Sequence, residues 1–119
     1  ITHKPIEKLT IGANLSLANL KSVDLSNASL PNANLSDSNL NGANLSLANL
    51  KGANLTSVDA TNAVFIMASL VNANLTRANL TGAQLIGADL RNAILGGVIF
   101  CKTTMPNKSI NNSGCQKQR

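Results

Sequence analysis

The side chains that could carry chemistry in this chain are few and far apart. The 119 residues include a single histidine, His3, and five acidic residues that occur singly along the sequence. Acid–base catalysis, an activated nucleophile and a metal cage all need such groups close together. We therefore expect no catalytic residue, no metal site and no cofactor, and a protein that is not an enzyme.

The two cysteines, Cys101 and Cys115, allow either two free thiols or one disulfide. Their number is even, neither belongs to the regular apolar pattern described below, and pairing would fix the tail to the segment that precedes it. A disulfide closing this 15-residue loop would stabilise the fold by about 3 kcal/mol in the chain-entropy model. We expect the Cys101–Cys115 disulfide, and with it an oxidising compartment.

An apolar residue recurs at every fifth position from Leu15 to Phe100. Most units read Ala-Asn-Leu followed by two polar or glycine residues. A helix does not suit this period, because successive centres would lie about 140° apart around its axis. Short extended segments suit it well, with Ala and Leu pointing inward, Asn outward and a turn after each unit. Stacked about 4.8 Å apart, such units form an all-β solenoid whose cross-section, from spacing alone, is triangular or square.

The expected core consists of the residues at the centres of these units. Among them we predict burial of Leu15, Leu35, Leu55, Phe65, Leu75, Leu95 and Phe100.

The ten residues 12–21, GANLSLANLK, recur unchanged at 42–51 and resemble the pentapeptide-repeat family. The resemblance covers about residues 13–102 and implies a right-handed quadrilateral β-helix of about four and a half coils, with residues 20 apart stacked in columns. Residues 1–12 would then form an N-terminal cap and residues 103–119 a C-terminal tail or cap pinned by the disulfide. Stacked Asn, Ser and Thr columns, such as the one through Asn14 and Asn34, would form side-chain ladders between coils.

Charge bears on one function known in this family, in which acidic members mimic duplex DNA and bind a type II topoisomerase. The whole chain carries a formal net charge of +5, but residues 13–100 contain four basic residues and four aspartates. A mimic needs regular negative charge and a DNA binder needs a basic stripe. We therefore expect no nucleic-acid partner and keep topoisomerase-directed mimicry as the alternative function.

Apolar residues replace polar ones on one part of the expected outer surface. Four units per coil would place together Leu47, Val64, Ile66, Met67 and Ile86. Single apolar residues on a surface are common, whereas a contiguous patch fits a protein partner or a second copy. We expect a non-catalytic structural or protein-interaction scaffold that uses this patch.

The compartment follows from the C-terminal segment. Residues 100–115 resemble the tail of exported cyanobacterial and chloroplast-lumen members of the family, which implies the periplasm or the thylakoid lumen. A first residue of Ile1 fits either a mature form after export or a shortened chain. No apolar run approaches the roughly 20 residues of a membrane helix, so we expect no membrane span.

Overall fold

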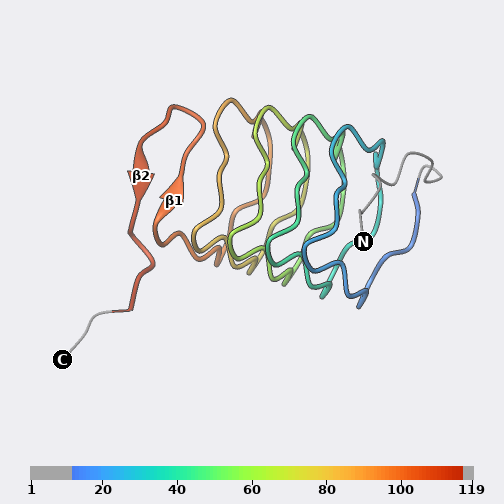
Figure 1. Cartoon of the computed structure of the whole chain (residues 1–119), viewed down its shortest axis with the longest axis horizontal. Helices are drawn as coiled ribbons and strands as arrows, with labels where there is room; N and C mark the ends of the chain where they lie inside the picture. Colours follow the sequence, from blue (N-terminus) through green and yellow to red (C-terminus); the bar gives the residue numbers. More distant parts are fainter. Residues whose placement is uncertain (1–11, 117–119) are drawn as a thin grey trace.

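The computed structural model describes residues 12–116, which wind into a coiled rod (Figure 1). Parallel β-bridges join residues 20 positions apart, from the pair Asn14 and Asn34 to the pair Gln84 and Thr104. One coil therefore contains four five-residue units, and each unit forms one side of the coil. This spacing selects the four-sided cross-section, which the fivefold period alone left open beside the triangular one.

Three backbone hydrogen bonds per unit hold adjacent coils together, two within each side and one at each corner. The Leu35 N–H donates to the carbonyl of Asn54 at 2.8 Å, and the Asn54 N–H donates to the carbonyl of Ala33 at 2.8 Å. The same pair of bonds recurs from side to side around the coil. Each three-residue segment is thus a short parallel strand, and its backbone groups are satisfied by the coils on either side.

Every corner between two sides turns through one residue with a positive φ. Such a residue occurs at every fifth position from Gly12 to Lys102. Each turn is closed by a bond such as that from the Ala48 N–H to the Leu45 carbonyl, at 3.1 Å. Glycine and asparagine fill most of these positions, because they adopt this conformation at little cost.

The outward Asn side chains fasten the corners rather than link the coils. Oδ1 of Asn54 accepts hydrogen bonds from the backbone N–H of Thr56 at 3.0 Å and from its Oγ1 at 2.6 Å. Equivalent bonds join Asn14 to Ser16, Asn34 to Ser36 and Asn74 to Thr76. The prediction of side-chain ladders between coils is therefore wrong. The residue that follows each central leucine, such as Thr56, finds no acceptor for its backbone N–H in the neighbouring coil. The side-chain oxygen of the Asn two residues earlier accepts this hydrogen bond instead.

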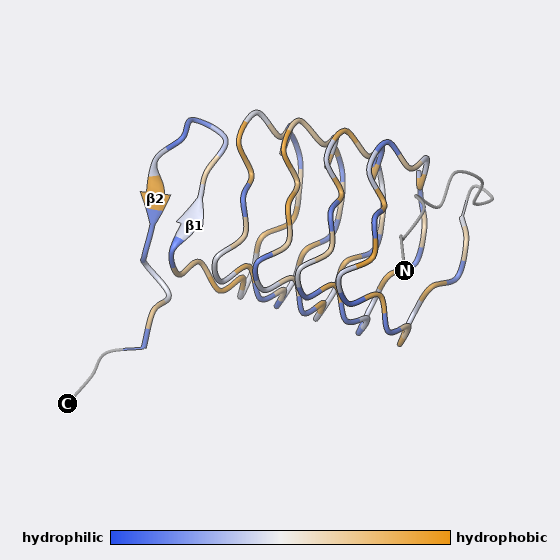
Figure 2. Ribbon diagram, viewed as in Figure 1, coloured by the Kyte–Doolittle hydropathy of each residue, from blue (hydrophilic) through white to orange (hydrophobic). Residues whose placement is uncertain are grey.

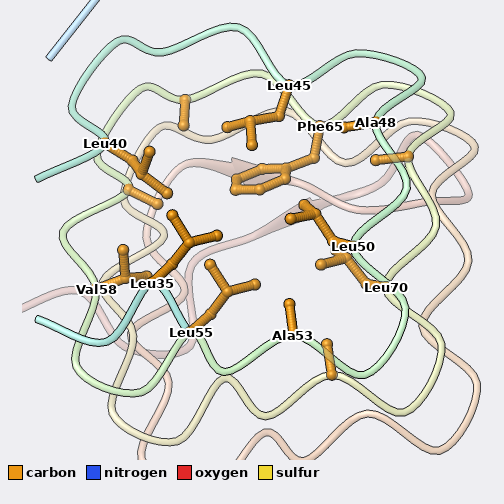
Figure 3. Close-up of a cluster of buried hydrophobic side chains, with 14 of the residues drawn as sticks. Leu35, Leu40, Leu45, Ala48, Leu50, Ala53, Leu55, Val58, Phe65 and Leu70 are labelled. Carbon is orange, nitrogen blue, oxygen red and sulfur yellow. The ribbon is translucent and has the colours of Figure 1, made fainter. Parts of the chain in front are cut away.

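Leucine and alanine side chains fill the interior of the rod (Figure 3). Hydrophobic and hydrophilic residues alternate along each coil (Figure 2), so that one set points inward and the other outward. The predicted core residues Leu35, Leu55, Phe65 and Leu75 are fully buried. The other three predicted core residues, Leu15, Leu95 and Phe100, are only partly buried against this core. They lie in the first and last described coils, which have a described neighbour on one side only.

A short hairpin continues the stack at the C-terminal end. Strand β1 (Thr103–Thr104) pairs antiparallel with strand β2 (Ile110–Asn111), and Thr104 also bridges to Gln84 in the preceding coil. The side chain of Thr103 is buried and its Oγ1 donates to the carbonyl of Leu80 at 2.7 Å. The stacking of coils therefore extends into the first residues of the predicted C-terminal cap.

A disulfide joins Cys101 and Cys115, as predicted from the sequence. Next to it, the Gly114 N–H donates to the carbonyl of Phe100 at 2.7 Å, so the tail lies against the end of the last coil. The predicted N-terminal cap, residues 1–12, falls outside the described residues except for Gly12. The described part of the chain has no helix that could cross a membrane.

Candidate interaction surface

The structure brings the five residues of the predicted apolar patch together along one corner of the rod. The Leu47 N–H donates to the carbonyl of Ile66 at 2.9 Å, and the Met67 N–H donates to the carbonyl of Ile86 at 2.8 Å. The corners that carry these residues are therefore direct neighbours in successive coils. Val64 lies on the adjoining side of the rod, two residues before Ile66. We call Leu47, Val64, Ile66, Met67 and Ile86 the corner stripe.

The two corner residues of this stripe are its most exposed members. The exposed fraction of Leu47 is 57% and that of Met67 is 58%. Val64, Ile66 and Ile86 are half-buried beside them. A contiguous strip of apolar side chains thus faces solvent across three coils.

Leu47 and Met67 also occupy an unfavourable backbone conformation. Their φ values are 61° and 60°, in the left-handed region where a residue with a Cβ costs roughly 1–2 kcal/mol. Glycine or asparagine would relieve this cost and would also remove apolar surface from water. The corner geometry requires a positive φ at these positions, but neither backbone preference nor solvation accounts for the apolar side chains that occupy them.

Gly87 keeps the end of the corner stripe flat. It occupies the corner one coil after Met67, and the Sδ atom of Met67 lies where a Cβ at residue 87 would be. The next residue in this column is in the hairpin, where the carbonyl of Pro106 accepts from the Gly87 N–H at 3.1 Å. The methionine side chain therefore lies along the rod over Gly87, toward the C-terminal end.

The charged groups of the described coils form no comparable cluster. Asp89 and Arg91 make an exposed ion pair at 2.8 Å, and the Arg91 guanidinium lowers the pKa of Asp89 by hydrogen bonding. The hydroxyl of Ser26, followed by its backbone N–H, lowers the pKa of Asp24. Residues 12–116 contain no pocket and no group of three His, Cys, Asp or Glu side chains that could hold a metal ion. His3 lies outside them.

Other apolar residues on the surface were not predicted from the sequence. Leu17 is 79% exposed and, like Leu47, has a positive φ, of 60°. The two are equivalent residues of the repeated ten-residue run, and their separation of 30 residues, or one and a half coils, puts them on opposite corners. Ile94 and Ile99 are also exposed, in columns where earlier coils carry Asn or Asp. Their departure from the repeat was the signal that could have revealed them.

The sequence matches the family model described as pentapeptide repeats, with eight copies over residues 11–37, 28–65 and 61–97. Among solved structures, a pentapeptide repeat protein from the thylakoid lumen of Arabidopsis thaliana is similar, with 33% identity and a TM-score of 0.74. That alignment covers 75% of this chain and 62% of the Arabidopsis protein, so this chain spans less than two thirds of its length. No curated protein matches the sequence.

Two further solved structures are similar to this chain at lower TM-scores. HetL, a pentapeptide repeat protein involved in heterocyst differentiation regulation in the cyanobacterium Nostoc, is 34% identical, covering 85% of this chain and 54% of HetL, with a TM-score of 0.46. QnrB1, a plasmid-mediated fluoroquinolone resistance protein, is 16% identical, covering 80% of this chain and 71% of QnrB1, with a TM-score of 0.49. The repeat match, together with the 20-residue coil, shows that this chain belongs to the pentapeptide-repeat family.

Proposed function

We propose that this protein is a non-catalytic interaction scaffold and that a protein partner covers its corner stripe. The observation that carries this proposal is the pair Leu47 and Met67, two apolar side chains held in solvent by a backbone conformation that disfavours them. A rigid rod is suited to this role, because hydrogen bonds between coils hold the backbone of the stripe in place and little backbone order has to be gained on binding.

The proposed scaffold is a right-handed quadrilateral β-helix of about four and a half coils. Residues 13–102 would form the rod, residues 1–12 would cover its N-terminal end, and residues 103–119 would cover its C-terminal end. The open ends of a solenoid need such covers, both to shield the last core layer and to prevent edge pairing.

We propose an oxidising, extracytoplasmic compartment for the mature protein, either the periplasm or the thylakoid lumen. Two observations support this location. The Cys101–Cys115 disulfide is of a kind that persists in oxidising compartments and is rare in the cytosol. The likeness to the Arabidopsis protein of the thylakoid lumen is in keeping with it.

The alternative function, mimicry of DNA toward a type II topoisomerase, lacks the acidic face that it needs. The aspartates of the coils point in different directions. Residues share a column only when they are separated by a multiple of 20 positions, and no two of these aspartates are. Asp24, Asp59 and Asp89 belong to three different sides of the rod, and Asp37 lies at a corner. Regular negative charge along one face is absent from the described coils, and we propose no nucleic-acid partner.

Affinity capture from the native compartment tests the proposed function. The double variant Ile66→Glu/Ile86→Glu places two charges in the corner stripe, and Leu17→Glu places one on the opposite corner as a matched control. A protein retained by the parent and by Leu17→Glu but lost with the double variant supports the proposal. Circular dichroism and thermal unfolding verify that both variants keep the fold. If all three baits retain the same proteins in the same amounts, the corner stripe is not a binding surface.

A further inference from the structure

We propose that the partner of the corner stripe is a second copy of this chain, packed side by side and antiparallel about a two-fold axis at Met67. This inference rests on the proposed function and names the molecule that covers the stripe. Three features of the described residues lead to it: the order of apolar residues along the corner, the polar residues beside them and the charges at the two ends.

The apolar residues of the corner stripe extend over one coil on either side of Met67. In the corner column, Leu47 lies one coil before Met67 and Gly87 lies one coil after it, while Ile86 directly precedes Gly87 in the chain. A two-fold axis through the Met67 coil therefore places Leu47 against Gly87 of the second copy, beside its Ile86, and the same contact recurs with the two copies exchanged. The two Met67 side chains meet at the axis, where an unbranched thioether adapts to a neighbour of the same kind. The same surface thus serves both copies, as a two-fold interface requires.

The polar residues beside the stripe follow the same symmetry. Asn44 and Gln84 bridge to Val64 from the preceding and the following coil. The proposed axis brings Asn44 opposite Gln84 of the second copy, and two primary amides can donate to and accept from each other. From Asn44 to Gly87, this side and corner of the rod carry no charged side chain, so packing would bury no unpaired charge there.

Opposite charges mark the two ends of the stripe and select the antiparallel arrangement. At the first coil, Oδ1 of Asp24 accepts hydrogen bonds from the Ser26 N–H at 2.9 Å and from the Ser26 hydroxyl at 2.6 Å, which hold the carboxylate at the corner. At the other end, Lys108 is exposed in the hairpin turn after Pro106, fixed by the bond from its N–H to the Met105 carbonyl at 2.8 Å.

Antiparallel packing brings Asp24 near Lys108 of the second copy at both ends of the interface. Parallel packing would place like charges together instead, which is unfavourable. The charge pattern therefore specifies both the occupant and its direction, because the two complementary charges belong to the same chain.

Sedimentation equilibrium of the disulfide-bonded full chain, over micromolar to several-hundred-micromolar concentrations, tests the proposal. We expect a reversible monomer–dimer equilibrium. Met67→Glu, which sets two like charges at the axis, should weaken dimerisation by more than about tenfold. Leu17→Glu makes the same type of change at an exposed residue of the opposite corner, in the same backbone conformation, and should leave the dimerisation constant unchanged.

Charge exchange tests the antiparallel register. Asp24→Lys and Lys108→Glu should each weaken dimerisation several-fold, and the double variant should recover most of the loss, since it restores opposite charges across the interface. Failure of the double variant to recover the loss overturns the register. Thermal unfolding of each variant separates a loss of dimer from a loss of fold.

The outcomes also separate this inference from the proposed function. A parent protein that stays monomeric at every concentration, or a dimer that survives Met67→Glu, overturns the inference that a second copy covers the stripe. If the parent is monomeric while Ile66→Glu/Ile86→Glu abolishes capture of a different protein, the inference fails and the proposed function stands. If neither self-association nor capture depends on the stripe, both proposals fail.

Discussion

The thioether of Met67 lies over the α-carbon of Gly87, one coil further along the chain, in the space that any larger residue would fill with its Cβ. We therefore expect Gly87→Ala to destabilise the fold by about 1–3 kcal/mol. The added methyl group would displace the methionine, and Gly87 has a φ of +69°, which alanine adopts only at a cost. The free energy of unfolding, measured in denaturant, gives this loss.

Gly96 offers the matched control for this substitution. Its φ is not positive, and a Cβ there would meet nothing within 4 Å. Gly96→Ala should leave stability unchanged or raise it slightly, because alanine restricts the unfolded chain. Equal losses at the two glycines would contradict both reasons given for the cost at Gly87, its positive φ and the Met67 contact.

Two buried hydroxyls should respond to removal with opposite signs. Oγ of Ser38 is buried without a hydrogen-bond partner, and its neighbours in the column are Ala18 and Val58. Ser38→Ala should therefore stabilise the protein by about 1 kcal/mol. Oγ1 of Thr103 donates to the Leu80 carbonyl, so Thr103→Val should destabilise it by a similar amount. Denaturant unfolding of both variants measures the difference, and a loss of stability in Ser38→Ala would indicate an unseen partner for its hydroxyl.

The Cys101–Cys115 disulfide should stabilise the C-terminal end of the rod selectively. Replacing both cysteines with serine should lower the free energy of unfolding by about 3 kcal/mol. Amide hydrogen exchange should accelerate at Gly114, whose N–H donates to the Phe100 carbonyl. Leu55, in the central coils, should still exchange only through global unfolding of the protein. Unchanged exchange at Gly114 would show that the tail stays in place without the covalent link.

The corner at Asp24 should make stability depend on pH in acid. The Ser26 hydroxyl, then its N–H, holds the pKa of Asp24 below its ordinary value of 3.8. A lowered pKa in the folded state contributes stability above the unfolded pKa, and this contribution disappears as the pH falls through the folded value. Ser26→Ala should therefore cost more stability at neutral pH than in strong acid. It should also raise the pKa of Asp24 in an NMR titration.

Ser36→Ala is the control for this pH dependence. Its hydroxyl makes the same bond, at 2.7 Å, to Asn34, which is neutral. Its effect on stability should therefore be the same at both pH values. A matching pH dependence in the two variants would exclude Asp24 as the source.

Much of the fold could be predicted because the fivefold spacing of leucine assigns an inward or outward direction to each residue. Residues such as Leu35 and Phe65 are buried as expected. The Asn columns were misjudged because the amide can serve either a ladder or a turn. The choice depends on which backbone N–H lacks a partner, and this becomes visible only when the corner geometry is known. The unpaired hydroxyl of Ser38 likewise depends on what surrounds it.

The corner stripe could be predicted because family resemblance supplied the number of units per coil, which then placed Leu47 beside Met67. Their unusual backbone conformation was missed. A signal for it was nevertheless present, since Gly42 and Gly52 stand at the same position of neighbouring units. Glycine recurs at this position of the unit because the position needs a positive φ. The backbone preference of leucine or methionine does not explain why either residue occurs there.

The four-sided coil gives insertions and deletions unequal consequences. Loss of a 20-residue block shortens the rod and leaves all later side chains facing the same way. Loss of one five-residue unit keeps every leucine inside but turns the remainder of the surface by a quarter revolution. A deletion of five residues between Leu47 and Val64 would thus separate the two halves of the corner stripe without disturbing the interior. The protein can therefore change its length without changing its surface pattern only by gaining or losing blocks of 20 residues.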